Sequence, residues 1–159
     1  MVWLCRVLVV SSLLGAVAGC GKKEEQKAEI VPQNGHGVRK ESTVVVPPSV
    51  KGQWKAVKIE VSDKDRNNKI VIAVPVGSQV TVPGSSMILK VDTFLPHFTM
   101  DGTTLTSQSN EPKNPAAQIR VIEDGKEIYK GWLFSRFPNT HKFEHPKYGF
   151  ILVDFVPAR

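Results

Sequence analysis

The sequence predicts an all-β protein, with a single antiparallel sandwich or barrel-like domain of about 7–8 strands placed after a disordered tether. Apolar residues alternate with polar ones at Val57, Ile59 and Val61, which is the pattern of a half-buried strand. Asp124-Gly125 separates two strand patterns, and Asp-Gly in that position is a strong hairpin signal. No stretch after the N-terminal region shows a helical pattern.

The first 19 residues are expected to be a signal peptide rather than part of the fold. A single charge, Arg6, precedes an apolar run over residues 7–17, which is too short to cross a bilayer core. The run ends in Val17-Ala18-Gly19-Cys20, which resembles the lipobox of bacterial lipoproteins. We therefore expect cleavage before Cys20 and attachment to its thiol of a diacylglycerol, which carries acyl chains such as palmitate. The alternative is an ordinary secretory signal with an incidental cysteine.

Lipidation would leave the mature chain without a thiol, because Cys5 departs with the signal and Cys20 becomes a thioether. Disulfides, thiolate-metal sites and cysteine nucleophiles are then excluded. Two or three acyl chains suffice for stable membrane anchoring. Gly21 replaces the Asp that retains such proteins at the inner membrane of enteric bacteria, so we expect an outer-membrane location facing the periplasm.

Residues 20–50 are predicted to be the acylated cysteine and a tether, and residues 51–159 the β domain. The tether starts with a nearly balanced charge run at residues 22–29, and its Pro and Gly residues break regular structure. Such a composition buries too little surface to offset chain entropy. Val44-Val45-Val46 is expected to add a short edge strand to the domain.

Within the domain, strands are expected at residues 57–61, 70–76, 79–82, 87–94, 118–122, 126–134 and 150–156. Residues 63–68 begin D-x-D-x-N, but Asn68 and Val74 replace the Gly and Glu of a calcium loop, so a hairpin tip is expected. Residues 95–117 are predicted to be an irregular loop.

The C-terminal stretch, residues 131–155, holds five of the seven Phe. Trp132 and Phe134 should share one face of a strand, with Leu133 on the other and Trp132 in the core. Residues 150–156 are nearly all apolar, which is typical of a strand covered on both faces. The loop at residues 135–149 also contains aromatic residues, which either fill the core or face a partner. Its candidate partner-binding residues are Arg136, Phe137, Phe143 and Tyr148.

The same stretch resembles a known family. W-x-F-x-x-x-P from Trp132, E-H-P-x-Y from Glu144, and a hydrophobic strand ending in V-D are similar to the signature of a bacterial envelope family, domain of unknown function 2155. The V-P-V-G at residues 74–77 is similar to its opening, and the resemblance covers about residues 54–159. It implies an envelope location and a fold, but no activity. Members carry a cysteine pair where this chain has Asp92 and Phe155, so no disulfide is implied.

Four histidines lie outside the signal: His36, His97, His141 and His145. His97-x-x-Met100 offers a nitrogen and a thioether to copper or haem, although a loop pair at this spacing is more often incidental. No zinc signature is present. His145 is expected to lock its loop by bonding a backbone carbonyl. No metal or cofactor is therefore predicted.

The chain carries a net charge of +6, and the 14 Lys and Arg from Gln53 onward exceed 11 Asp and Glu by only three. That excess is too dispersed for nucleic-acid binding. No G-x-S-x-G or phosphate-binding glycine pattern occurs, and no motif pairs Asp92, Asp101 or Glu144 for sugar cleavage. The sequence predicts a non-enzymatic, membrane-anchored envelope lipoprotein that binds another envelope protein. The alternative is a periplasmic carrier of a small ligand, haem or metal, using His97, Met100 and the loop at residues 95–117.

Overall fold

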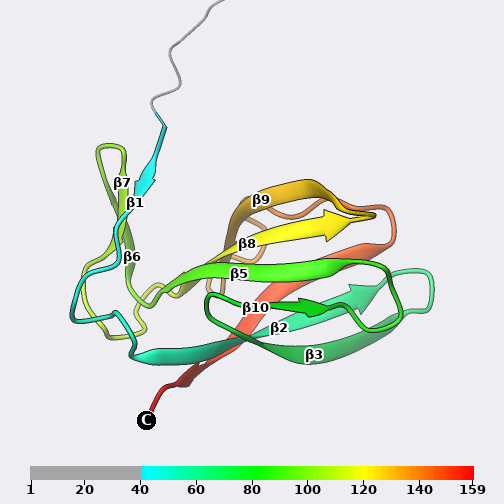
Figure 1. Cartoon of the computed structure of the whole chain (residues 1–159), viewed down its shortest axis with the longest axis horizontal. Helices are drawn as coiled ribbons and strands as arrows, with labels where there is room; N and C mark the ends of the chain where they lie inside the picture. The colour runs from blue at the N-terminus through cyan, green and yellow to red at the C-terminus, as the bar shows by residue number, and fades with distance from the viewer. Residues whose placement is uncertain (1–40) are drawn as a thin grey trace, which may run out of the picture. The chain divides into compact units, whose positions relative to one another are not determined.

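The computed structural model describes residues 41–159, which form ten strands and no helix (Figure 1). The predicted signal peptide, Cys20, His36 and the tether up to residue 40 lie outside the described residues. The strands are β1 (Thr43–Val44), β2 (Trp54–Asp63), β3 (Asn68–Pro75), β4 (Gln79–Thr81), β5 (Ile88–Leu95), β6 (Phe98–Asp101), β7 (Thr104–Ser107), β8 (Ala116–Glu123), β9 (Lys126–Phe134) and β10 (Tyr148–Pro157). They form three sheets, in the orders β10-β2-β3, β4-β5-β8-β9 and β1-β7-β6.

Strand β2 is the centre of the first sheet and pairs antiparallel with both β3 and β10. The predicted alternation is confirmed, because Val57, Ile59 and Val61 are at most 3% exposed. The predicted hairpin tip is also confirmed: Asp63 Oδ1 accepts the backbone N–H groups of Asp65 and Arg66 at 3.1 Å. This side chain closes the turn in the way Asp commonly does.

The second sheet, β4-β5-β8-β9, is antiparallel throughout. Asp124 and Gly125 connect β8 to β9 with φ values of 50° and 77°, as a type I′ hairpin turn requires. The hairpin predicted from Asp-Gly is therefore confirmed. In β5 the register shifts between Val91 and Thr93, which leaves Asp92 without a partner residue in β8.

The apolar faces of these two sheets meet in one core. Its buried members are Val57, Ile59, Val61, Val74, Val82, Met87, Leu89, Val91, Phe94, Ala117, Ile119, Val121, Leu133, Phe143, Tyr148, Phe150 and Leu152. The all-β prediction is confirmed, but the domain has more strands than predicted. No sheet of residues 41–159 closes into a barrel, so that alternative is wrong.

The third sheet accounts for the extra strands. Strands β6 and β7 form a hairpin within residues 95–117, so the prediction of an irregular loop is wrong. The missed signal is Asp101-Gly102, the same dipeptide that marked the β8–β9 hairpin. Strand β1 adds to β7 in parallel, with the Thr43 N–H donating to Thr103 O and the Val45 N–H to Leu105 O, both at 2.9 Å.

The domain therefore begins before residue 51. Strand β1 confirms the expected edge strand, and Val50 is only 2% exposed. The segment between β1 and β2 forms a turn, in which the backbone N–H groups of Val50 and Lys51 both donate to Pro47 O. Residues 43–50, predicted as tether, belong to the fold.

In β9, Leu133 enters the core while Trp132 and Phe134 lie on the opposite face, as predicted. Both rings pack edge-on against Phe98, with centroid distances of 5.1 and 5.0 Å. Trp132 is only half-buried and outside the core cluster, so its predicted core position is wrong. On that face Trp132 packs against Phe98 of β6, a four-residue strand of the short β6–β7 hairpin.

Strand β10 is not covered on both faces, which corrects another prediction. Its register against β2 shifts between Leu152 and Asp154, and Val153 is 44% exposed at that bulge. The Lys58 ammonium group donates to Asp154 at 2.8 Å, and this hydrogen bond holds the pKa of the Asp154 carboxyl below its usual value.

Candidate binding sites

The segment between β9 and β10, residues 135–147, is called the C-terminal loop below. Phe143 fixes this loop, because its side chain is 2% exposed and inserts into the core. Its ring contacts Phe150 and Tyr129, with centroid distances of 5.0 and 5.3 Å. At the start of the loop, the Ser135 N–H donates to Pro115 O at 3.0 Å.

His145 fixes the other end of the loop. Its Nδ1 accepts the backbone N–H groups of Lys147 at 3.2 Å and Tyr148 at 3.1 Å. The ring also stacks on Phe143 and on Tyr148, with centroid distances of 5.6 and 5.7 Å. His145 was predicted to lock the loop by a hydrogen bond to a backbone carbonyl. The ring does bind the backbone of the loop, but it accepts hydrogen bonds from two amide groups instead. Its Nε2 lies 3.7 Å from a Glu123 carboxylate oxygen.

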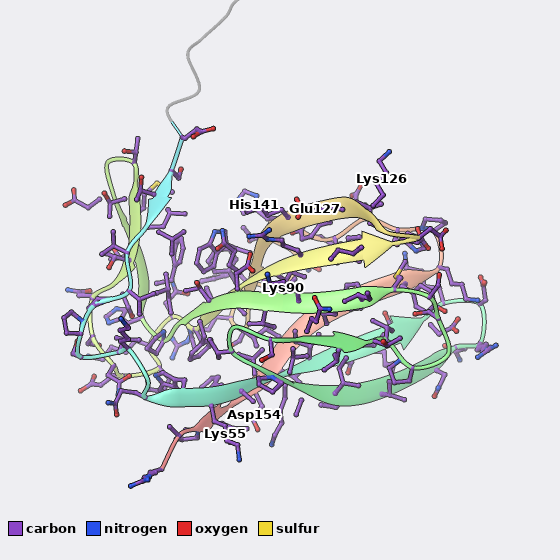
Figure 2. All side chains as sticks on the ribbon, viewed as in Figure 1. Lys55, Lys90, Lys126, Glu127, His141 and Asp154 are labelled. Atoms are coloured by element: carbon purple, nitrogen blue, oxygen red, sulfur yellow. The ribbon has the colours of Figure 1, made fainter. Side chains whose placement is uncertain are left out.

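Tyr129 ties the middle of the loop to β9. Its hydroxyl donates to His141 O at 2.6 Å, and its ring lies across Gly131, where a Cβ would collide with it. His141 accordingly lies beside β9 (Figure 2). Covering a strand glycine with a neighbouring aromatic ring is a known way to stabilise a sheet. Burial raises the pKa of Tyr129 above its ordinary value.

This shift makes a prediction for alkaline solution. The unfolded chain releases the Tyr129 proton near pH 10, whereas the folded chain retains it to higher pH. The contribution of Tyr129 to the free energy of unfolding is therefore fully present below about pH 10, and it is lost as the pH rises through the folded-state pKa. We expect Tyr129→Phe to lower the melting temperature at about pH 8, through the lost hydrogen bond, and to flatten its decline above about pH 10. Thermal unfolding of both proteins across that range tests this, and parallel curves would contradict it.

The loop leaves two of the four predicted partner-binding residues accessible. Phe137 is 58% exposed and Arg136 is exposed. Phe143 and Tyr148 are 2% and 5% exposed, and the Tyr148 hydroxyl donates to Gly84 O at 3.3 Å. These two rings fill the core, which removes them as contacts for a partner. The core-filling alternative therefore holds for Phe143 and Tyr148, whereas Arg136 and Phe137 are exposed to solvent.

The surroundings of the loop are basic. Three shallow hollows, of about 390, 360 and 200 Å³, all have Lys142 in their lining. Lys64 lines two of them and Lys130 the third, and Glu144 is the one carboxylate among the lining residues. Such a surface favours an acidic partner.

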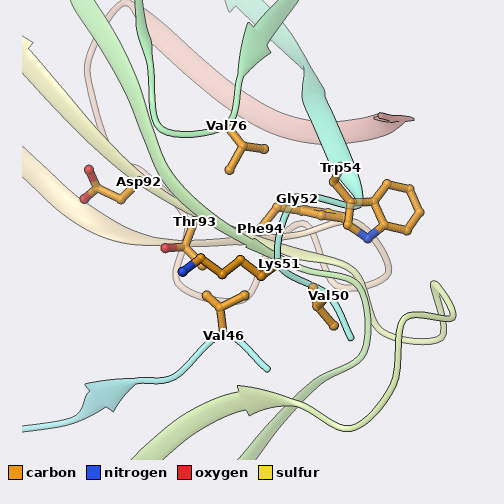
Figure 3. A pocket seen from close by; sticks show the side chains of 9 residues that line it. All are labelled: Val46, Val50, Lys51, Gly52, Trp54, Val76, Asp92, Thr93 and Phe94. Carbon is orange, nitrogen blue, oxygen red and sulfur yellow. The ribbon is translucent and has the colours of Figure 1, made fainter. Parts of the chain in front are cut away.

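A second candidate site is a groove of about 360 Å³ (Figure 3). Its lining residues are Val46, Val50, Lys51, Gly52, Trp54, Val76, Asp92, Thr93 and Phe94. Trp54 forms a wall: its Nε1–H donates to Asn110 Oδ1 at 2.7 Å, and its ring packs edge-on against Phe94 and Phe155, both at 5.1 Å. A mostly apolar hollow of this size with a few polar groups is typical of small-molecule sites.

The acidic group of the groove is already engaged. Arg120 Nε donates to Asp92 at 2.5 Å, and the Lys90 ammonium group lies 3.5 Å from the same carboxylate. Asp92 therefore anchors the bulge of β5 rather than standing free for catalysis. Lys51 is exposed and is the cation of the groove.

The groove was missed in the sequence because its walls come from distant segments. Residues 46–54 were assigned to the tether or the start of the domain, and residues 92–94 to a strand. The available signal was the pair of apolar residues that flank Pro47-Pro48, namely Val46 and Val50. A tether that stays in solvent has no structural use for apolar residues at these positions.

The metal or haem candidates do not converge. His97 Nδ1 lies 3.0 Å from Ser109 Oγ, and the His97 N–H donates to Ser107 Oγ at 2.8 Å. Met100 is 61% exposed on the edge hairpin. Within residues 41–159, no three His, Cys, Asp or Glu side chains are grouped so as to hold a metal ion.

Comparison with known proteins finds no matching family model, no curated protein and no solved structure that resembles the chain. The resemblance to domain of unknown function 2155 stays a prediction. In the part of the chain that the structure describes, no helix is both long and apolar enough to cross a membrane.

Proposed function

We propose that this chain is a lipid-anchored, non-catalytic binding module of the bacterial cell envelope, and that it holds a partner protein through Arg136 and Phe137. The observation that carries the proposal is an exposed phenylalanine, Phe137, on a loop whose other aromatic residues are fixed in the core. A single exposed apolar ring is common on protein surfaces, so the support lies in its neighbours: Phe137 follows Arg136 on an anchored loop, and aromatic and arginine side chains are enriched in binding hot spots.

The loop is prepared for binding. Phe143, His145 and Tyr129 hold it at three points, so little conformational entropy remains to be lost when a partner binds. Arginine and aromatic side chains are the types enriched in binding hot spots. Lys142 and its neighbours add a basic rim, which favours an acidic partner surface and faster association.

The anchor completes the proposal. Cys20, lipidated after removal of residues 1–19, would place the protein on the outer membrane facing the periplasm. The tether would join Cys20 to a β-sandwich domain that carries a small third sheet on its flank. The lipobox supports this placement, and so do the W-x-F and E-H-P-x-Y motifs of the envelope family.

The proposal predicts a position-specific cross-link. A photo-crosslinking amino acid at Phe137, in the full-length protein produced in its native host, should give a discrete adduct whose mass names the partner. Asn67, an exposed turn residue far along the chain, is the matched control and should give none. Arg136→Ala should reduce the yield at Phe137 by about tenfold, since a hot-spot residue contributes more than 1 kcal/mol. The absence of an adduct at Phe137 would refute the interface.

The groove beside Trp54 supports a second candidate function, the carriage of a small, largely apolar ligand with an anionic group near Lys51. Native mass spectrometry of the full-length protein purified from its host would detect such a ligand. Absorption spectra with added haem or copper address the His97 and Met100 alternative. A retained ligand that is displaced by Val46→Trp would assign it to the groove.

A further inference from the structure

Strand β3 is an open edge. It ends the order β10-β2-β3, and no strand of residues 41–159 pairs with its outer side (Figure 1). Residues 70–73 of this edge, Ile-Val-Ile-Ala, are all apolar, and Val71 is 57% exposed. A long apolar edge offers unpaired backbone groups to another strand.

The inner face of β3 is also incompletely covered. Ile70 and Ile72 lie opposite Val61 and Ile59 of β2 and point into the same core. Val61 and Ile59 are 3% and 0% exposed, whereas the two β3 residues are only half-buried. Since these neighbours share one face, the difference arises because no strand lies beyond β3. A strand added there would complete the core.

The other edges of the two large sheets are protected. Strand β4 has only three residues, β9 carries Lys126, Glu127 and Lys130, and β10 is bent by its bulge. These are the usual devices against edge pairing. The only charged residue of β3 is Lys69, and Glu60 pairs with it at 2.8 Å.

We propose that β3 pairs antiparallel with β3 of a second copy of this chain, about a two-fold axis at Val71. The two three-stranded sheets then join into one of six strands. This register places Val71 opposite Val71, Ile70 opposite Ile72, and Lys69 opposite Ala73. An isologous contact of this kind requires a self-complementary surface.

The charges fit this register and orientation. The antiparallel arrangement sets each Lys69 against Ala73, a small apolar residue, whereas a parallel one would set Lys69 against Lys69. Lys58, the β2 neighbour of Ala73, is bound to Asp154 at 2.8 Å, and Lys69 to Glu60. No unpaired cation therefore faces another across the interface.

A single pair of strands buries less surface than the roughly 1,200–2,000 Å² of stable complexes. The pairing is accordingly weak in dilute solution, and chemical trapping suits it better than chromatography. The pairing uses strand β3, whereas the proposed partner binds Arg136 and Phe137 on the C-terminal loop. The two proposals can therefore be tested independently.

Cysteine trapping tests the register. Opposite residues of an antiparallel pair have Cα atoms about 4.5–5.5 Å apart, within the range of a disulfide. After copper-phenanthroline oxidation of the purified full-length protein in detergent, Val71→Cys alone should give a covalent dimer. Lys69→Cys and Ala73→Cys should each give little alone but should link efficiently when mixed. The unsubstituted chain sets the background.

Val71→Lys adds a charge at the centre of the edge and should reduce the mixed Lys69→Cys and Ala73→Cys dimer at least tenfold. Because Val71 is 57% exposed, its substitution should leave the folded protein intact, which circular dichroism verifies. Dimer yields at background level, or equal yields at all three positions, would overturn the pairing. The same oxidation of native-host cells before purification would also overturn it if it linked Val71→Cys to a different protein, in favour of a foreign strand on this edge.

Discussion

Phe143→Ala should destabilise the protein by about 3–5 kcal/mol, the cost of emptying a buried phenylalanine site. The ring is 2% exposed and fills the space between Tyr129, Phe150 and His145. Its removal leaves a cavity and frees the C-terminal loop from the core. Against a typical domain stability of roughly 5–15 kcal/mol, this loss is large. We expect a melting temperature lower by roughly 10–20 °C in thermal unfolding of the full-length protein.

The matched variant is Phe137→Ala, which removes the same side chain from the same loop. Phe137 is 58% exposed, so its loss should change stability by less than about 0.5 kcal/mol while reducing partner binding. The two variants thus separate the stabilising role of the loop from its binding role. If Phe143→Ala had the same melting temperature as the unsubstituted protein, Phe143 would not fix the loop to the core. The argument that it is prepared for binding would then fail.

Local patterns were sufficient for most strands. The alternation at Val57, Ile59 and Val61 and the Asp124-Gly125 turn depend only on neighbouring residues, and both predictions are confirmed. The β6–β7 hairpin was missed because its strands are short and rich in Thr and Ser, which masked the Asp101-Gly102 signal. The hairpin packs on the rest of the domain through Phe98, which contacts Trp132 and Phe134.

The burial of individual loop aromatics could not be read from the sequence. Phe137 and Phe143 have the same side chain and lie six positions apart, yet one is exposed and the other is core. The difference arises because residues 141–148 run back over the edge of the two sheets, where Tyr129 and Phe150 receive Phe143. That path depends on long-range packing, which no local pattern encodes.

The same limit applies to the groove. Its walls combine residues 46–54 with residues 92–94, and their meeting depends on the parallel pairing of β1 with β7 and on the bulge at Asp92. Parallel pairs of two residues and bulges have no reliable sequence signature. The groove is therefore evident only in the folded chain.

Trp54→Ala should cost about 3 kcal/mol, at the low end for a tryptophan because its side chain is half-buried. The change removes two edge-on contacts, with Phe94 and Phe155, and leaves the Asn110 amide oxygen without its 2.7 Å donor. It also removes one wall of the groove. Chemical denaturation should show a lower midpoint, and any ligand retained in the groove should be lost.

Two control variants separate these contributions. Asn110→Ala removes only an exposed hydrogen bond and should cost no more than about 1 kcal/mol. Trp132→Ala removes the other tryptophan of the described residues, which packs on Phe98 and does not line the groove, so it should leave ligand retention unchanged. Equal ligand loss from Trp54→Ala and Trp132→Ala would show that general destabilisation, rather than the groove wall, releases the ligand. Loss from Trp54→Ala alone would assign the ligand to the groove.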